Sequence, residues 1–142
     1  MNKPFTPYTL KDIPTPSFVM SPVELKDYID FEVKRIYFIT HPTGVTSEHM
    51  HFVEKEFFIL VQGTCTAIID SGQGKEEIAM EGPTSALYVP NYVWHGFKDF
   101  SENAVLLALS STNYNPDRSD YQENYEEYLK IRDEKINELY TL

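Results

Sequence analysis

The chain has a single cysteine, Cys65, no long apolar run and few basic residues. One cysteine cannot form an intramolecular disulfide, so no cross-link supports the fold. No stretch of about 18 apolar residues occurs, which argues against a membrane-spanning helix. The N-terminal segment MNKPFTPYTL lacks the apolar core of a signal peptide, and we therefore expect a cytoplasmic protein.

Positive charge is scarce throughout the chain. Twelve Lys and Arg residues stand against 22 Asp and Glu residues, which gives a net charge of −10. Nucleic acids and anionic membranes are therefore not expected as partners. The same charge works against any anionic small ligand, unless positive charge is gathered locally at its binding site.

Length and periodicity predict one β-rich domain over residues 1–142. A chain of 142 residues can bury a core of its own, and its aromatic content of 14% suits β-structure. Apolar and polar residues alternate with a period of two, which predicts strands. The expected strands are 11–14, 21–23, 31–40, 56–62, 64–70, 76–80, 86–89, 93–97 and 105–110.

The pattern changes near the C-terminus. From about residue 119 to residue 140, tyrosines and aliphatic residues such as Tyr125, Tyr128 and Leu129 recur at helical spacing. Ser119 or Asp120 is the expected N-terminal cap. The chain is therefore predicted to be all-β, a single barrel or sandwich, with one C-terminal helix.

The chemically most informative residues are His49 and His51, followed by Glu56 and, 44 residues after His51, by His95. Side chains alternate along a strand, so His49 and His51 share one face. Together with Gly44, Gly63, Gly82 and Pro90, this spacing is similar to the two-part signature of the cupins, small β-barrels with polar side chains at the mouth. Paired imidazoles can bind a metal or transfer protons near neutral pH, and the spacing leaves both open.

A longer stretch, from Val33 to about Lys130, resembles the sugar 3,4-ketoisomerases that act on thymidine-diphosphate-linked (dTDP-linked) 4-keto-6-deoxyglucose. These enzymes are relatives of the RmlC-type cupins. The matching segments are 33–39, 49–51, 82–90, 93–95, 99–101 and 104–110, with a tyrosine-rich tail ending near 125–130. Residues 46–48 read Thr-Ser-Glu where the family usually has Arg-Gly-x, and the Arg-Gly usual near the N-terminus is absent around residues 16–17. Glu56 stands where the family tends to have Gln.

The resemblance implies an RmlC-like jelly-roll cupin barrel and a cytoplasmic isomerase. Its product feeds an aminotransferase that makes 3-amino-3,6-dideoxy sugars for surface polysaccharide such as lipopolysaccharide. The resemblance also implies a homodimer, with the option of exchanging the N-terminal strands, residues 1–30, between subunits.

The isomerase chemistry gives roles to particular residues. Removal of the C3 proton next to the C4 ketone yields an enediolate, which is reprotonated at C4 and leaves the carbonyl at C3. We expect His49 and His51 to be the proton-transfer pair, with the assignment of base and acid open, because an unperturbed imidazole has a pKa near ~6.5. Tyr37 and Arg35 share a strand face. Tyr37 is expected to hydrogen-bond a sugar oxygen, and Arg35 to steady the enediolate or diphosphate charge.

Further substrate contacts are expected from Trp94 and Tyr92, which offer flat faces to thymine, and from His95 and Glu56. We expect no metal and no other cofactor, because a cation would occupy the lone pairs that must accept the proton. Glu56 then orients one imidazole, and a turn or bulge in residues 52–55 is needed to bring it to the face of the histidines.

Two alternatives stay open. One is a metal-dependent cupin enzyme with His49, His51, Glu56 and His95 as ligands. The other is a cupin that binds a nucleotide sugar without turning it over.

Overall fold

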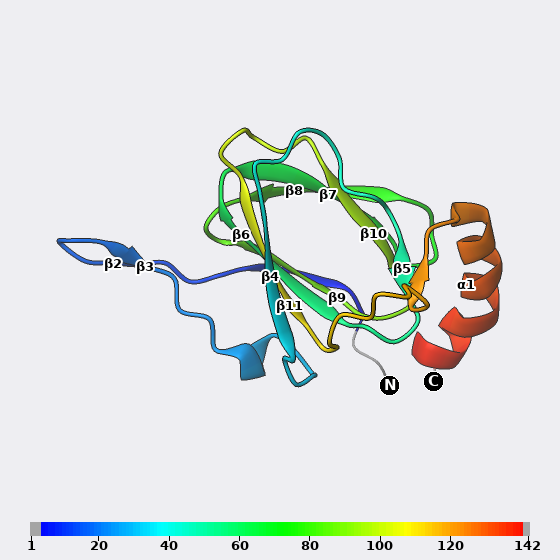
Figure 1. The fold of residues 1–142 in the computed structure, drawn as a ribbon. Helices are drawn as coiled ribbons and strands as arrows, with labels where there is room; N and C mark the ends of the chain where they lie inside the picture. The colour runs from blue at the N-terminus through cyan, green and yellow to red at the C-terminus, as the bar shows by residue number, and fades with distance from the viewer. Residues whose placement is uncertain (1–3, 141–142) are drawn as a thin grey trace.

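Two antiparallel sheets face each other in the computed structural model, which describes residues 4–140 and side chains as far as residue 135 (Figure 1). The larger sheet has the order β1 (Thr6–Thr9), β9 (Ser85–Val89), β6 (Glu56–Gln62), β11 (Val105–Ser110) and β4 (Arg35–Thr40). The smaller sheet has the order β10 (Trp94–Lys98), β7 (Thr64–Asp70) and β8 (Glu76–Glu81). Two short pairs complete the strands: β12 (Tyr121–Gln122) with β5 (Met50–His51), and β2 (Ile13–Pro14) with β3 (Val19–Met20).

The apolar core lies between the two sheets. Phe58 and Leu60 from β6 meet Ile69 from β7, and Leu87 and Leu106 close the cluster from β9 and β11. Each of these strands presents alternate side chains inward, as the two-residue period predicts. The core fixes the positions of the strands whose ends carry the polar side chains described below.

A backbone contact joins β5 to the smaller sheet. The amide of His49 donates to the carbonyl of His95 at 3.0 Å, and the amide of His95 donates to the carbonyl of His49 at 2.9 Å. This reciprocal pair extends the smaller sheet to the order β12-β5-β10-β7-β8. Residues 46 apart in sequence thereby become direct neighbours.

Most predicted strands are confirmed, and β6, β7 and β11 have the predicted bounds. The strand expected over residues 31–40 begins only at Arg35. The strand expected over residues 21–23 is wrong, because β3 is Val19–Met20 and pairs with Ile13–Pro14. The hydroxyl oxygen of Thr15 accepts the amide hydrogen of Phe18 at 2.9 Å and closes the turn between them.

The C-terminal helix α1 (Tyr125–Tyr140) begins later than predicted, and neither Ser119 nor Asp120 caps it. The side-chain oxygen of Asn124 accepts the amide hydrogen of Glu127 at 3.0 Å and is the actual cap. Residues 121–122 form β12 instead of a first helical turn. No helix in the described part of the chain is both long and apolar enough to cross a membrane.

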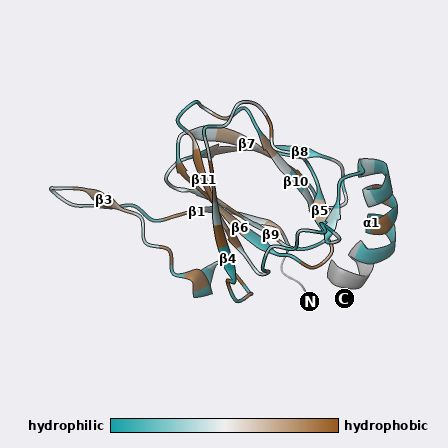
Figure 2. Cartoon of the chain, viewed as in Figure 1, coloured by the Kyte–Doolittle hydropathy of each residue, from teal (hydrophilic) through white to brown (hydrophobic). Residues whose placement is uncertain are grey.

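The tyrosines of α1 attach the helix to the barrel. The ring of Trp94 lies 5.1 Å from that of Tyr125 and 5.4 Å from that of Tyr128. The hydroxyl of Tyr128 also donates to the backbone carbonyl of Asp70 at 2.8 Å. The outward side of the helix is mostly hydrophilic (Figure 2).

The hairpin β2–β3 projects away from the barrel as an arm, at the left of Figure 1. Four of its apolar side chains are about half exposed to solvent: Ile13, Phe18, Val19 and Met20 are 42%, 59%, 60% and 47% exposed. The outer face of the edge strand β4 is apolar as well, with Ile36 and Phe38 exposed. Exposed apolar patches of this kind usually mark a contact surface.

Candidate functional site

Three imidazoles meet at the mouth of the barrel because of the strand pairing. His49 is opposite His95, and His51 follows two residues later on the same face of the chain. The ring centroid of His49 lies 4.7 Å from that of His51 and 4.8 Å from that of His95. The Nε2 atoms of His49 and His51 are only 3.1 Å apart. The predicted shared face of the two histidines is therefore confirmed.

Tyr37 and Glu56 reach this cluster from the larger sheet. The central strand β11 pairs Ser110 with Glu56 on one side and with Arg35 on the other, while Ala108 pairs with Tyr37. Ser110 and Ala108 are small, so the longer side chains on either side can approach each other above β11. The hydroxyl of Tyr37 donates to Oε2 of Glu56.

Glu56 faces inward because the chain bends between β5 and β6. Without this bend, strand alternation would place Glu56 on the face opposite to His49 and His51. Its side chain is buried, and Oε1 lies 3.2 Å from Nε2 of His51 and 3.3 Å from Nε2 of His95. Burial by itself would raise the pKa of Glu56, but the hydrogen bonds from His51 and His95 hold it well below its usual range. Glu56 is therefore a carboxylate at neutral pH.

Arg35 faces the same side as Tyr37, as predicted, and its guanidinium carbon lies 5.4 Å from the centre of the Tyr37 ring. Its Nη2 donates to Oε1 of Glu54 at 2.7 Å, and Glu54 is buried. The hydroxyl of Thr112 donates to the same oxygen at 2.7 Å. Arg35 thus balances the charge of Glu54 behind the site instead of extending into the cavity.

His51 lies against three carboxylates. Its Nε2 is 3.3 Å from Glu54 and 3.2 Å from Glu56, and its Nδ1 is 3.3 Å from Oδ2 of Asp120. Burial would lower the pKa of His51, but the hydrogen bonds to Asp120 and Glu56 raise it to about 9. The oxygens of Asp120 also accept the amide hydrogens of Val53 and Glu54 at 2.7 and 3.1 Å, which fixes the carboxylate in place.

His49 has the opposite electrostatic environment. Burial, together with the neighbouring charges of His95 and His51, lowers its pKa to about 3. At neutral pH, His49 is therefore an uncharged imidazole next to a cationic one. Of the two imidazoles, only His51 carries the additional proton that makes the ring a cation.

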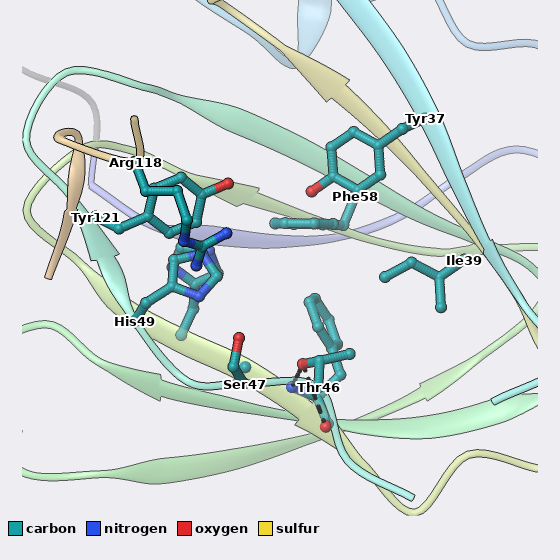
Figure 3. Close-up of a pocket in the computed structure, with 11 residues that line it drawn as sticks. Tyr37, Ile39, Thr46, Ser47, His49, Phe58, Arg118 and Tyr121 are labelled. Carbon is teal, nitrogen blue, oxygen red and sulfur yellow. Dashed lines mark hydrogen bonds between the residues drawn. The ribbon is translucent and has the colours of Figure 1, made fainter. Parts of the chain in front are cut away.

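A cavity of about 210 Å³ opens beside His49 (Figure 3). Tyr37 extends into it from one side, and Arg118 and Tyr121 from the other. Arg118 lies over the ring of Tyr121, 4.0 Å from its centre, and is the only lysine or arginine among the described residues that lines the cavity. Pockets that enclose a drug-sized ligand usually measure about 300–1,000 Å³, so this cavity suits a single sugar ring.

The structure separates the predicted site residues into two groups. Tyr37, His49 and His95 line the cavity, whereas His51 and Glu56 lie directly behind them. This second pair can act on a bound molecule only through the first group.

Trp94 and Tyr92, which were predicted to contact thymine, lie away from the cavity. Trp94 is 2% exposed, lies under α1, and donates its Nε1 hydrogen to Glu48 at 2.9 Å. Tyr92 stands edge-on against Phe52, with ring centroids 5.9 Å apart. Neither residue lines the cavity, because the aromatic faces near β10 are used to attach the C-terminal segment.

Four residues of the site escaped the sequence analysis: Glu54, Arg118, Asp120 and Tyr121. Asp120 and Tyr121 lie in the segment that was expected to begin the helix, and Arg118 directly precedes it. A pattern of Asp120-x-x-Glu123 resembles a helix cap, but the segment instead forms β12 and pairs Tyr121 with His51. The scarcity of arginine in an acidic chain is a signal that could have drawn attention to Arg118, although Arg35 and Arg132 share it.

The same cluster contains a set of metal-ligand atoms. One ligand atom each from His49, His51, Glu56 and His95 lies within 4.8 Å of the others. Three imidazoles and one carboxylate are a donor set that suits first-row transition metals.

Comparison with known proteins gives consistent matches. The family model described as FdtA: WxcM-like, C-terminal matches residues 5–133. The chain is 33% identical, over 110 residues that cover 76% of it and 78% of the relative, to the TDP-4-oxo-6-deoxy-alpha-D-glucose-3,4-oxoisomerase of Aneurinibacillus thermoaerophilus.

Solved structures agree with the sequence comparison. The sugar 3,4-ketoisomerase QdtA from Thermoanaerobacterium thermosaccharolyticum, in complex with TDP, matches with a TM-score of 0.83 and 28% identity, covering 95% of this chain and 98% of that one. The RmlC epimerase of Mycobacterium tuberculosis matches with a TM-score of 0.70 and 13% identity, covering 80% of this chain and 66% of that one, and shows the fold alone. The predicted RmlC-like cupin fold and the resemblance to the ketoisomerases are thereby confirmed.

Proposed function

The chain belongs to the family described as FdtA: WxcM-like, C-terminal, whose relatives are named as TDP-sugar 3,4-ketoisomerases, and we propose that it is itself such an isomerase. The observation that carries the proposal is the pair of adjacent histidines with opposite protonation states beside a cavity of the size of a sugar ring. A binding protein without catalytic activity has no need of such a pair.

His49 acts as the base. It lines the cavity and is uncharged at neutral pH, so its lone pair is available for the C3 proton of a 4-keto sugar. An imidazole with a low pKa is a weak base, but the negative charge that develops on the enediolate raises the pKa of His49 as the proton moves. The same imidazolium then returns the proton to C4. The cationic His51, whose Nε2 lies 3.1 Å from Nε2 of His49, adds positive charge that stabilises the intermediate.

The oxygen atoms exchange a proton as well, since O3 must lose its proton and O4 must gain one before the carbonyl stands at C3. The hydroxyl of Tyr37 lines the cavity and is hydrogen-bonded to the carboxylate of Glu56. Burial, together with the charge and hydrogen bond of Glu56, raises the pKa of Tyr37 far above its usual value. Tyr37 is therefore a neutral hydroxyl that can accept and donate at these oxygens while it remains protonated in every stable state.

The substrate is thymidine-diphosphate-4-keto-6-deoxyglucose, with the sugar in the cavity and the nucleotide outside it. The relative from A. thermoaerophilus is named for this substrate, and a solved relative was obtained with TDP. In a chain with a net charge of −10, Arg118 supplies the local positive charge that a diphosphate requires. We assign Arg118 to the diphosphate, in place of the direct contact predicted for Arg35.

The product is a 3-keto sugar nucleotide, which a transaminase can convert to a 3-amino-3,6-dideoxy sugar for surface polysaccharide. Sugar nucleotides are made and used in the cytoplasm, and we propose that compartment for this protein. The reaction requires no metal, because imidazole lone pairs and hydrogen-bond donors suffice to move a proton next to a ketone.

The active form is a homodimer in which the arm β2–β3 of each chain crosses to its partner. The exposed apolar side chains of the arm and of the outer face of β4 support this arrangement, because a second copy would remove them from water. The arm also stands clear of its own barrel (Figure 1), as an exchanged segment must.

The test of the activity is incubation of the untagged protein with thymidine-diphosphate-4-keto-6-deoxyglucose, followed by NMR of the sugar carbons. We expect the carbonyl signal to move from C4 to C3. Unchanged substrate at high enzyme concentration would overturn the proposal, and retention of the substrate without conversion would favour a binding protein.

A further inference from the structure

The cavity at the barrel mouth has two chemically different ends. Arg118 and Tyr121 extend into it from one side, and Ile39 extends into it from the opposite side (Figure 3). Ile39 packs against the core cluster that contains Phe58 and Phe97, and the rings of these two residues lie 4.8 Å apart. All three apolar side chains line the cavity, and we call them the apolar wall.

Strand geometry connects the apolar wall with the reacting groups. Tyr37 and Ile39 are two residues apart on β4, so their side chains project from the same face of the strand. Two residues of a strand advance by about 6.6 Å, which is comparable with the width of a substituted sugar ring. One sugar can therefore contact the hydroxyl of Tyr37 at one carbon and the side chain of Ile39 at a neighbouring substituent.

The polar side chain that borders the apolar wall is already hydrogen-bonded. The hydroxyl oxygen of Thr46 accepts the amide hydrogen of Phe97 at 2.9 Å, and the hydroxyl itself donates to the carbonyl of Phe97 at 3.5 Å. That carbonyl also accepts the amide hydrogen of Thr46 at 2.9 Å. A ligand hydroxyl that reached this wall would have to displace a bond of Thr46 or remain without a partner.

The chemistry of the proposed function determines how a sugar lies in the cavity. Its C3 and C4 must meet His49 and Tyr37, and its C1, which carries the diphosphate, must point toward Arg118. C1 and C4 lie on opposite sides of a six-membered sugar ring, and C5, which carries C6, follows C4. With C1 toward Arg118, C6 therefore reaches the far side of the cavity, where Figure 3 shows Ile39.

We propose that the apolar wall receives the C6 methyl group of the substrate and makes the enzyme selective for 6-deoxy sugars over 6-hydroxy sugars. This assignment rests on the proposed function. Contact between a methyl group and the wall removes apolar surface from water. A hydroxyl at C6 instead loses its hydrogen bonds to water and meets a Thr46 hydroxyl that is already bonded to Phe97. Ile39 is therefore a specificity-determining residue that takes no part in the proton transfer.

The first measurement compares two stable ligands. Thymidine-diphosphate-6-deoxyglucose and thymidine-diphosphate-glucose differ only in the hydroxyl at C6, and neither contains the ketone that isomerisation requires. Isothermal titration calorimetry gives both dissociation constants. We expect the glucose compound to bind about 10- to 100-fold more weakly, which is the range in which an apolar pocket rejects an added hydroxyl.

Two variants of Ile39 separate polarity from size. Ile39→Val shortens the side chain without adding a polar group, and Ile39→Thr gives nearly the same shape with a hydroxyl in place of one methyl. Ile39→Val should keep the wild-type ratio of the two dissociation constants to within about twofold, whereas Ile39→Thr should lower it by about fivefold or more. Ile39 is only partly buried, unlike Phe58 and Phe97, so both variants should fold, which circular dichroism and thermal melting check.

Turnover of thymidine-diphosphate-4-keto-6-deoxyglucose provides the second readout. Ile39→Thr should raise KM more than Ile39→Val does, with little change of kcat in either, because Ile39 contacts the methyl group and not the reacting carbons. Equal affinity of the two stable sugars in the wild type, or an equal ratio in the two folded variants, would overturn the assignment even in an active isomerase. A wild-type protein that prefers the 6-deoxy sugar but isomerises nothing would count against the proposed function and support the assignment.

Discussion

At the barrel mouth polar side chains are buried, whereas on the N-terminal arm apolar side chains are exposed. Glu56 and His95 are 1% and 2% exposed, while Phe18 and Val19 are 59% and 60% exposed. Ordinary folding would place each of these residues the other way round. Burial of polar groups and exposure of apolar groups both lower the stability of the isolated chain. Each region is therefore explained by a binding partner, a small molecule at the mouth and a second chain at the arm.

The two regions differ in what completes them. The mouth is completed by a small molecule, because its polar groups converge on a cavity and partly compensate one another through His51, Glu54 and Glu56. In the proposed dimer the arm is covered by an apolar surface of the partner, because its exposed side chains are apolar and do not converge on a cavity. Buried polar groups thus indicate chemistry here, and exposed apolar groups indicate assembly.

The largest effect is expected from the paired histidines. His49→Asn and His51→Asn should each lower kcat by roughly 10²-fold or more, because each removes a group that moves or holds the reacting proton. Folding should persist, since both residues lie at the mouth and not in the apolar core between the sheets. Steady-state kinetics with the keto sugar measures the loss, and wild-type rates in both variants would remove the proton-transfer role.

The proposed role of the arm is tested by measuring dimer formation, not enzymatic activity. Phe18→Ser combined with Val19→Ser should raise the dimer dissociation constant by about tenfold or more, as loss of central apolar contacts does in other interfaces. Analytical ultracentrifugation over a range of concentrations gives the constant. The control is Val45→Ser, which alters a side chain that is exposed outside the arm. A wild-type protein that stays monomeric at high concentration would refute the exchange.

Asp120 contacts His51 and raises its pKa, so a variant of Asp120 tests the role of His51 separately from that of His49. Asp120→Asn removes the carboxylate that raises the pKa of His51 to about 9, so this pKa should fall toward the ordinary value near ~6.5. Since His51 must be cationic to stabilise the enediolate, the alkaline limb of the kcat profile should move to lower pH, with a loss of about tenfold at pH 8. A pH–rate profile that keeps its shape would show that Asp120 is merely structural.

The raised pKa of His51 also makes the stability of the folded protein depend on pH. A group whose pKa is raised on folding stabilises the native state below its unfolded pKa and loses that contribution as the pH rises through its folded value. For His51 the contribution is therefore complete below about pH 6.5 and is lost as the pH rises toward about 9. Thermal melts of the wild type and of Asp120→Asn should differ most just below about pH 6.5, where Asp120 is still ionised, and should converge above about pH 9.

The smallest effect is expected at Arg118, which is partly exposed. Arg118→Gln should raise KM about three- to tenfold and leave kcat nearly unchanged, because a charged contact to the diphosphate is lost in a solvent-accessible position. Lys26→Gln removes the same charge from an exposed position on the 3-10 helix Leu25–Asp27 and serves as the control for general electrostatic attraction. Equal changes in both variants would mean that Arg118 has no specific role.

Local pattern predicted the framework well. β6, β7 and β11 were predicted with their observed bounds because each is a short, largely apolar run of the length of a strand. The shared face of His49 and His51 was predictable from the alternation of side chains along a strand, and so was the need for a bend before Glu56.

The sequence could not predict what depends on distant pairing. Asp120 approaches His51 because β12 pairs with β5 across 70 residues of chain, and no local pattern specifies that pairing. The faces of Trp94 and Tyr92 were assigned to thymine because the sequence does not show where the tyrosines of α1 pack. The small residues Ala108 and Ser110, which let Tyr37 meet Glu56, became informative only once β11 was known to lie between β4 and β6.

The central claim is that a proton leaves C3 and returns to C4 by way of an imidazole that is partly open to solvent. Turnover of thymidine-diphosphate-4-keto-6-deoxyglucose in deuterated water, followed by NMR of the product, measures this directly. His49 lines an open cavity, so its proton exchanges with solvent and deuterium should appear at C4 of the 3-keto product. A 3-keto product with no deuterium at C4 would contradict the account.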